Sequence, residues 1–211
     1  MAAPANKNIG DLNGKWFLNK TLSDPIDPAL QLQGIGWLIR KAIGAASVTL
    51  HVTQYSGPPK PPNPSTDPVS HIDIQQVATA GLKGTTENRT IDFVPRDHSD
   101  WLFGTVRGQT KWMTGAEVQD LVKEGAEALT KGWVEGGFIA EGWLEGEEEK
   151  GGPEGETHVL SFVENIDGSG WTGTQVWGFQ TVAGERRYAR NVVIGKKGKF
   201  VNIRMVYDWV P

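Results

Sequence analysis

Residues 171–209 read WTGTQVWGFQTVAGERRYARNVVIGKKGKFVNIRMVYDW, and this stretch sets the expected fold class. It contains three runs of alternating apolar and polar side chains, separated by turns at 183–185 and 195–198. Alternation with a period of two is typical of strands with one buried face, and short glycine-containing turns join antiparallel neighbours. The pattern predicts three consecutive antiparallel strands over 171–182, 186–194 and 199–209.

The last of these strands has two chemically distinct faces, because successive side chains of a strand point to opposite sides of the sheet. We expect the apolar face to point inward, and it consists of Val201, Ile203, Met205, Tyr207 and Trp209. Asn202, Arg204 and Asp208 share the other face.

Upstream, short runs with the same character predict further strands, over residues 48–55, 70–78, 89–94, 101–113, 138–144 and 157–165. Residues 57–68 (GPPKPPNPSTDP) contain six prolines, which have no N–H for a strand ladder, and are expected to form a loop.

One segment breaks the strand pattern. Thr114 and Glu117 form a capping box, and apolar residues recur at helical spacing after it, which predicts an amphipathic helix over 114–131. Residues 113–156 hold twelve acidic and three basic residues, so we expect this insertion to be a solvated, acidic excursion, with a turn-rich part at 145–156.

Short strands throughout, with few helices, favour a single all-β domain over residues 1–211. A closed antiparallel up-and-down β-barrel is the economical arrangement, because closure removes the exposed edges of a sheet. The helices are expected to cap or flank this barrel.

Composition excludes several classes of function. The chain has no Cys, which removes disulfides and thiolate chemistry, and its net charge of −4 argues against nucleic acid as a partner. No window is long and apolar enough for a membrane span, so we expect a cytoplasmic protein. The four His residues are scattered, no catalytic motif occurs, and neither a metal nor a cofactor is expected.

The N-terminal region resembles the calycin superfamily, which includes the lipocalins and the intracellular fatty-acid-binding proteins. Gly14-Lys15-Trp16 matches the Gly-x-Trp opening of that superfamily. Residues 18–27 and 30–42 are similar to the two short lid helices of the fatty-acid-binding proteins, and 34–41 (GIGWLIRK) matches the run in the second of them. The resemblance implies a barrel with a helical lid and an interior that binds a hydrophobic small molecule.

The chain departs from the family pattern in its greater length and in the motif that holds a ligand carboxylate. The family commonly has Arg-x-Tyr on the last strand, whereas this chain has Arg204 three residues before Tyr207, which places the two on opposite faces. Tyr207 is therefore the expected inward group. The resemblance also implies a second internal Arg two strands earlier, for which Arg190 is the candidate, although an exposed Arg190 is the plainer alternative.

Nine Trp residues favour either a densely packed core or an aromatic-lined cavity. The candidate ligand-binding residues are Trp37, Arg107, Trp112, Trp177, Phe179, Tyr188, Arg190, Met205 and Tyr207. Trp37 would lie near the portal or simply pack the lid onto the barrel. Arg107 and Trp112 lie on opposite faces of a regular strand, so only one of them can line the cavity.

Three functions remain open from the sequence. The chain could be a carrier that holds a hydrophobic small molecule unchanged, or a cofactor-free cyclase or isomerase of a natural-product pathway on the same scaffold, whose cavity folds a reactive substrate. The third alternative is an interaction module that uses the acidic helix at 114–131. No catalytic residue is assigned at this stage.

Overall fold

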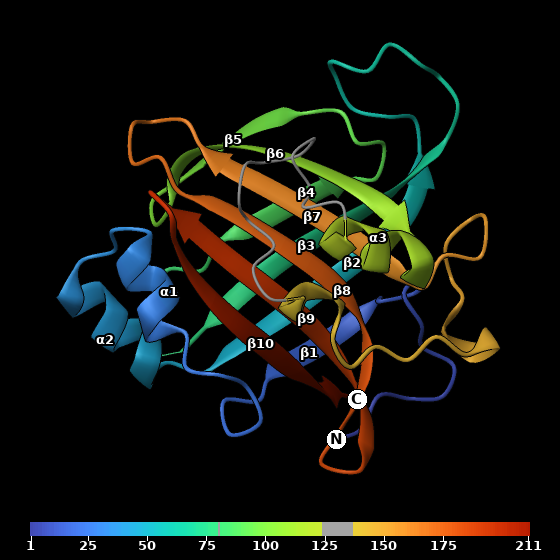
Figure 1. Ribbon diagram of the computed structural model, residues 1–211, viewed down its shortest axis with the longest axis horizontal. Helices are drawn as coiled ribbons and strands as arrows, with labels where there is room; N and C mark the ends of the chain where they lie inside the picture. Colours follow the sequence, from blue (N-terminus) through green and yellow to red (C-terminus); the bar gives the residue numbers. More distant parts are fainter. Residues whose placement is uncertain (80, 124–136) are drawn as a thin grey trace.

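The computed structural model describes residues 1–79, 81–123 and 137–211. In this part of the chain, ten strands form a single antiparallel sheet that curls strongly into a half-barrel (Figure 1). The strands are β1 (Gly14–Leu18), β2 (Val48–Gly57), β3 (Val69–Ala78), β4 (Thr86–Thr90), β5 (Arg96–Asp100), β6 (Gly104–Met113), β7 (His158–Asn165), β8 (Thr172–Val182), β9 (Glu185–Lys196) and β10 (Lys199–Val210).

The order across the sheet is β4-β3-β2-β1-β10-β9-β8-β7-β6-β5, so the first and last strands of the chain pair in its middle. The edges of the sheet are β4 and β5, and among the described residues no ladder joins them. The two sides of the sheet meet at one point, where Phe93 N–H donates to the carbonyl of Thr110 at 2.8 Å. The mostly-β, antiparallel character of the predicted fold is therefore confirmed. The structure shows a half-barrel with a gap between β4 and β6, where a closed barrel was predicted.

The three C-terminal strands follow the predicted pattern. The turns between them are Ala183-Gly184 and Lys197-Gly198, and all four residues have a positive φ, as the tight turns of two-residue hairpins require. The β-strand predicted at 89–94 is shifted, since β4 ends at Thr90, and β5 lies in a segment for which no strand was predicted.

Two short helices, α1 (Asp27–Leu32) and α2 (Trp37–Ala45), lie at one end of the half-barrel (Figure 1). They confirm the predicted lid, but both start later than expected, because residues 19–26 form a loop after β1. Ala29 and Leu30 are the buried residues of α1, and they face apolar residues of β9 and β10. No helix in the described residues is long and apolar enough to cross a membrane.

The acidic insertion is less solvated than predicted. Helix α3 (Gly115–Lys123) begins with the expected capping box, in which Thr114 N–H donates to Glu117 Oε2 at 2.7 Å; residues 124–131 of the predicted helix lie outside the described part. Two 3-10 turns follow, η1 (Phe138–Ala140) and η2 (Glu147–Glu149). The strand predicted at 138–144 is wrong, because the apolar side chains of η1 pack with α3 onto the outer face of the sheet.

This outer layer contains Met113, Val118, Ile139, Leu160, Val176 and Val193. In Figure 1, α3 lies in front of the sheet, on its convex side. The sheet is thus covered by apolar packing on both faces in this region, which explains why β7 and β8 are buried along nearly their whole length.

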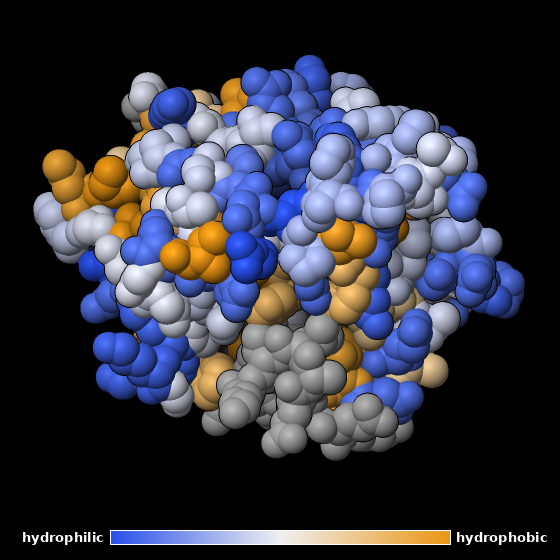
Figure 2. Space-filling view, turned by 90° about the horizontal axis from the view of Figure 1, so that it is seen from above, coloured by the Kyte–Doolittle hydropathy of each residue, from blue (hydrophilic) through white to orange (hydrophobic). Residues whose placement is uncertain are grey.

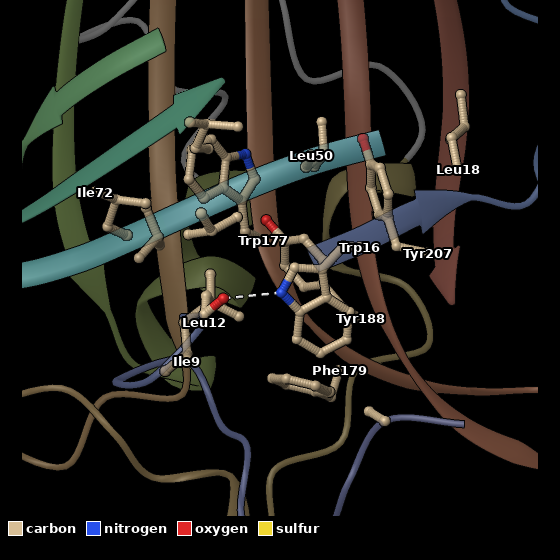
Figure 3. Packing of buried hydrophobic residues seen from close by; sticks show 14 of the residues in the cluster. Ile9, Leu12, Trp16, Leu18, Leu50, Ile72, Trp177, Phe179, Tyr188 and Tyr207 are labelled. Atoms are coloured by element: carbon tan, nitrogen blue, oxygen red, sulfur yellow. Dashed lines mark hydrogen bonds between the residues drawn. The ribbon is translucent and has the colours of Figure 1, made fainter. Parts of the chain in front are cut away.

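The main core fills the concave side of the sheet away from the lid. Trp16, Trp177, Phe179, Tyr188 and Tyr207 are fully buried there (Figure 3). The rings of Phe179, Trp16, Tyr188 and Tyr207 contact one another in that order. Trp16 Nε1 donates to the carbonyl of Leu12 at 2.8 Å, so even this buried indole is hydrogen-bonded. The aromatic residues therefore form a rigid floor beneath the space under the lid.

Candidate functional site

An apolar cavity of about 190 Å³ lies between the lid and the aromatic floor. Apolar side chains from α1, β2, β9 and β10 line it, and they include Leu30, Leu50, Val192, Ile203 and Met205. The turn between β5 and β6 adds Trp101, Leu102 and Phe103, and the turn between β3 and β4 adds Leu82. A small, mostly apolar cavity of this kind suits a hydrophobic ligand.

A second cavity of about 280 Å³ occupies the gap between β4 and β6 and is lined mainly by polar residues. It includes Asn88, Arg89 and His98, and it shares Gln76, Glu87 and Gln175 with the apolar cavity. The interior therefore has an apolar compartment under the lid and a polar compartment at the open edge of the sheet, with polar side chains where they meet.

Arg190 is the central polar group of the apolar cavity. Its side chain is 3% exposed, and its guanidinium lies 4.0 Å from the centre of the Trp177 ring. Nε donates to the hydroxyl of Tyr188 at 2.9 Å, and Nη1 donates to Glu87 Oε2 at 3.4 Å. Nη2 is buried and has no hydrogen-bond partner among the described residues. Arg190 therefore has one donor that no described residue uses.

Glu87 balances this charge from the other side of the interior. Its carboxylate accepts hydrogen bonds from Gln76, Arg89 and Arg190, and its side chain is 16% exposed. Burial by itself would raise the pKa of Glu87, but the positive charges of Arg190 and Arg89 outweigh it and hold the pKa below the usual value. Glu87 is therefore ionised at neutral pH and forms an ion pair with Arg190.

The two tyrosines beside Arg190 remain protonated. Burial raises the pKa of Tyr207 well above the ordinary value and raises that of Tyr188 as well, although the charge of Arg190 acts in the opposite direction. Tyr207 lines the apolar cavity, and its hydroxyl has a single weak contact, 3.8 Å from the sulfur of Met205. It is thus a second donor available to a ligand.

The structure divides the nine predicted site residues into three groups. Arg190, Met205 and Tyr207 line the apolar cavity, while Trp177, Phe179, Tyr188 and Trp112 belong to the core beneath it. Trp37 begins α2 and is 63% exposed, away from the cavity lining. Arg107 is exposed on the outer face of β6, where it pairs with Asp97 at 2.7 Å. The interior face of β6 is therefore that of Val106 and Trp112.

Sequence reasoning missed the polar residues that face Arg190 from β3, β4 and β8. Gln76, Glu87 and Gln175 each follow another polar residue in a strand, and each resembles an ordinary solvent-facing position. For Gln76, the only signal was its place on the same strand face as Ile72 and Ile74, both fully buried.

The arrangement offers hydrogen-bond donors and aromatic surfaces rather than a nucleophile. Arg190 Nη2 and the Tyr207 hydroxyl can both donate to an oxygen of a bound molecule, and the apolar walls exclude water around it. Among the described residues, no cluster of three acidic or His side chains could hold a metal ion. The cavity can therefore bind, orient and polarise a hydrophobic molecule.

Comparison with known proteins gives two kinds of likeness. No family model matches the chain. It is 28% identical to a probable pericyclase, scpY, of Mollisia scopiformis, over 99% of this chain and 95% of that protein. It is also 26% identical to the pericyclase pydY of an Acremonium species, over 100% of this chain and 97% of that protein. Both similarities extend over nearly the full length.

Solved structures share the fold at much lower identity. Lipid binding protein 8 of Caenorhabditis elegans has a TM-score of 0.57 and 13% identity, covering 96% of this chain and 98% of that one. A Schistosoma mansoni fatty acid binding protein, solved with arachidonic acid, has a TM-score of 0.54 and 12% identity, covering 97% of this chain and all of the other. The chain therefore shares its fold with these lipid-binding and fatty-acid-binding proteins.

Proposed function

We propose that the chain is a cofactor-free pericyclase, which binds a hydrophobic, polyunsaturated small molecule beneath the lid and closes a ring in it. The observation that carries this proposal is buried Arg190, which lines a mostly apolar cavity together with the protonated Tyr207. Its guanidinium lies 5.6 Å from the centre of the Tyr207 ring, and its Nη2 has no partner among the described residues. The similarity to two pericyclases over nearly the whole chain supports the same conclusion.

A pericyclic ring closure moves π electrons into new σ bonds within one molecule, so no atom is gained or lost and no redox cofactor is consumed. Such a reaction needs the reacting carbons held close together in one conformation, and confinement between Trp177, Tyr188 and the lid would supply that orientation. Hydrogen bonds from Arg190 and Tyr207 to a carbonyl conjugated with the reacting alkene would draw electrons from it and lower the barrier.

A carrier is the second candidate, because the fold is that of proteins named for binding lipids and fatty acids. Both candidates share hydrophobic ligand binding and differ in the fate of the ligand. Donors at Arg190 and Tyr207 suit both candidates, because an oxygen of a carried ligand could also accept from them. The similarity to two pericyclases over nearly the whole chain favours the pericyclase.

The proposal extends to the whole chain. Residues 1–211 would act as one domain, in which β4 and β6 complete a closed barrel around the bound molecule, and the hydrogen bond from Phe93 to Thr110 supports this closure. The cytoplasm is the proposed location, on the composition of the chain. The acidic helix α3 packs on the outer face of the sheet, which argues against its use as a free interaction module.

The gene for this protein is deleted in the organism that encodes it, and an organic extract of the deletion strain is prepared. The unconverted substrate is expected to accumulate in this strain. Purified protein is incubated with the extract, and the products are separated by liquid chromatography with mass detection. A pericyclase yields a compound of unchanged mass, altered retention time and reduced ultraviolet absorption, since conjugated double bonds are lost. Recovery of every bound compound unchanged would contradict the proposal and favour a carrier.

A further inference from the structure

The buried charges that line the apolar cavity are one guanidinium and one carboxylate, which form an ion pair. Arg190 is the buried cation of its lining and Glu87 is the carboxylate, and the two are hydrogen-bonded at 3.4 Å. Lys83 also contributes to the lining, but it is exposed at the rim, where water screens its charge. Arg89, the other cation that contacts Glu87, lines the polar cavity rather than the apolar one.

This balance changes what Arg190 can accept. A carboxylate held by Arg190 Nη2 would also lie within several ångströms of Glu87, because both groups contact the same guanidinium. Two like charges this close repel each other strongly where the effective dielectric constant is far below that of water. Such a ligand would in addition lose its hydration in an apolar space.

An uncharged ligand oxygen is not repelled by Glu87 and does not carry the hydration cost of a carboxylate. The carbonyl of an amide, ketone or ester accepts a charge-assisted hydrogen bond from Nη2 without adding net charge to the cavity. The Tyr207 hydroxyl is an uncharged donor in the same lining, and it can donate to the second lone pair of such an oxygen.

We infer that Glu87 determines the specificity of the cavity, by neutralising Arg190 so that the site selects an uncharged carbonyl compound over a carboxylic acid. This inference rests on the proposed function and names its substrate class: a hydrophobic molecule whose polar group is a neutral carbonyl. Glu87 acts through Arg190 and is therefore a positioning and selectivity residue, rather than a catalytic one.

The test compares two probes that differ only in charge, dodecanamide and dodecanoic acid, by isothermal titration at pH 7.5. Wild-type protein is expected to bind the amide at least tenfold more tightly than the acid. The wild-type comparison requires no variant, so it stands even where a substitution harms folding. Equal binding, or tighter binding of the acid, would overturn the inference while leaving ligand binding intact.

The variant Glu87→Gln removes the negative charge and keeps the shape of the side chain. It is expected to strengthen binding of dodecanoic acid at least tenfold and to leave dodecanamide within about threefold, so that the preference is lost or reversed. Glu147→Gln is the matched control, because it removes the same charge from an exposed side chain of η2 that does not line the cavity. Thermal melting verifies that both variants are folded.

The outcomes separate this inference from the proposed function. If Glu87→Gln is folded and keeps the wild-type preference for the amide, Glu87 does not set the selectivity. If neither probe binds the wild-type protein, hydrophobic ligand binding fails and the inference fails with it. A preference that disappears in Glu87→Gln and persists in Glu147→Gln supports the inference.

Discussion

Glu87 of β4 and Arg190 of β9 form an ion pair across the interior of the curled sheet, although 103 residues separate them in sequence. β4 is an edge strand, and β9 lies near the middle of the sheet, so the pair spans the concave side. It lies where the apolar cavity meets the polar one, since Glu87 lines both. The interaction thus connects an edge of the fold to the residue proposed to polarise the substrate.

Replacing Arg190 by Lys is expected to lower the rate of ring closure at least tenfold, and more than it weakens binding. Lysine keeps the positive charge beside Glu87, but its ammonium cannot donate to Tyr188, Glu87 and the substrate in the fixed geometry of a guanidinium. Single-turnover conversion and ligand titration, measured on the same preparation, separate the two effects. Equal losses in rate and affinity would mean that Arg190 only binds the substrate.

Replacing Tyr207 by Phe is expected to slow conversion about tenfold with little change in stability. The hydroxyl has only the weak contact with Met205 in the described residues, so its removal leaves no strong donor or acceptor unpaired. The ring, which stacks on Tyr188 with centroids 5.2 Å apart, is retained. The midpoint of urea unfolding should move by less than the change caused by Tyr207→Ala, which serves as the destabilised comparison.

The same residue predicts how the rate depends on pH. Because burial raises the pKa of Tyr207 above its ordinary value near 10, the phenol stays protonated in moderately alkaline solution. The rate of the wild-type protein should therefore remain constant between pH 7 and pH 10. A fall over this range that is absent from Tyr207→Phe would show that the phenol ionises, and would contradict the assignment of Tyr207 as a buried neutral donor.

The sequence predicted the elements that local pattern controls. Alternation over 199–209 placed Tyr207 and Met205 on the inward face, and both line the cavity. The capping box at Thr114 fixed the start of α3. The strand predicted at 138–144 is wrong, because the same apolar spacing suits both a strand and a 3-10 turn that packs on another element. Gly142 also has a φ of 78°, which interrupts an extended backbone.

The centre of the site depends on contacts that no local pattern contains. The sequence left open whether Arg190 is buried or exposed. Its partner Glu87 could not be identified, because β4 begins before the strand that was predicted at 89–94. Trp37 belongs to the lid as the resemblance implied, yet a residue at the start of a helix can point outward, and this one does, since it is 63% exposed. Figure 2 shows hydrophobic surface at its left, on the side of the molecule where α1 and α2 lie. Side-chain direction at a helix end is a tertiary property.

Glu145 is expected to make stability depend on pH on the acidic side. It lies 2.6 Å from Nε2 of fully buried His158 and accepts a hydrogen bond from Thr157 at 2.7 Å. Burial would raise the pKa of Glu145, but these hydrogen bonds and the charge of His158 lower it overall. A lowered pKa in the folded state contributes stability above the ordinary value near 4.5, and this contribution is lost as the pH falls through the folded pKa.

The variant Glu145→Gln should therefore be less stable than wild type at pH 7 and equally stable at pH 3. The difference at pH 7 should be small, about 0.5 to 1 kcal/mol, because the Glu145 side chain is 45% exposed and water screens the interaction. Urea unfolding at the two pH values measures it. A difference that persists unchanged at pH 3 would assign the effect to the hydrogen bonds with Thr157 and His158 rather than to the charge of Glu145.

Glu149 and Arg186 should be the ion pair on which stability depends most. The Glu149 side chain is 1% exposed, and its two oxygens accept from Arg186 at 2.6 and 2.5 Å. Arg186 also donates to the carbonyls of Pro4 and Lys7 and stacks on Phe179 at 3.9 Å. This one guanidinium therefore ties the N-terminal segment and the acidic insertion to β9 beneath the aromatic floor.

Removing one partner of a buried ion pair leaves the other as an uncompensated buried charge, and this typically lowers the free energy of unfolding by about 3 to 5 kcal/mol. Replacing both partners by apolar residues is often neutral. We expect Glu149→Met to lower the free energy of unfolding by about 3 kcal/mol, and the double variant Glu149→Met with Arg186→Met to recover part of it. Recovery should be incomplete, because the carbonyls of Pro4 and Lys7 also lose their donor. Urea unfolding of the two single variants and the double variant gives the coupling energy, and strictly additive losses would contradict a direct interaction.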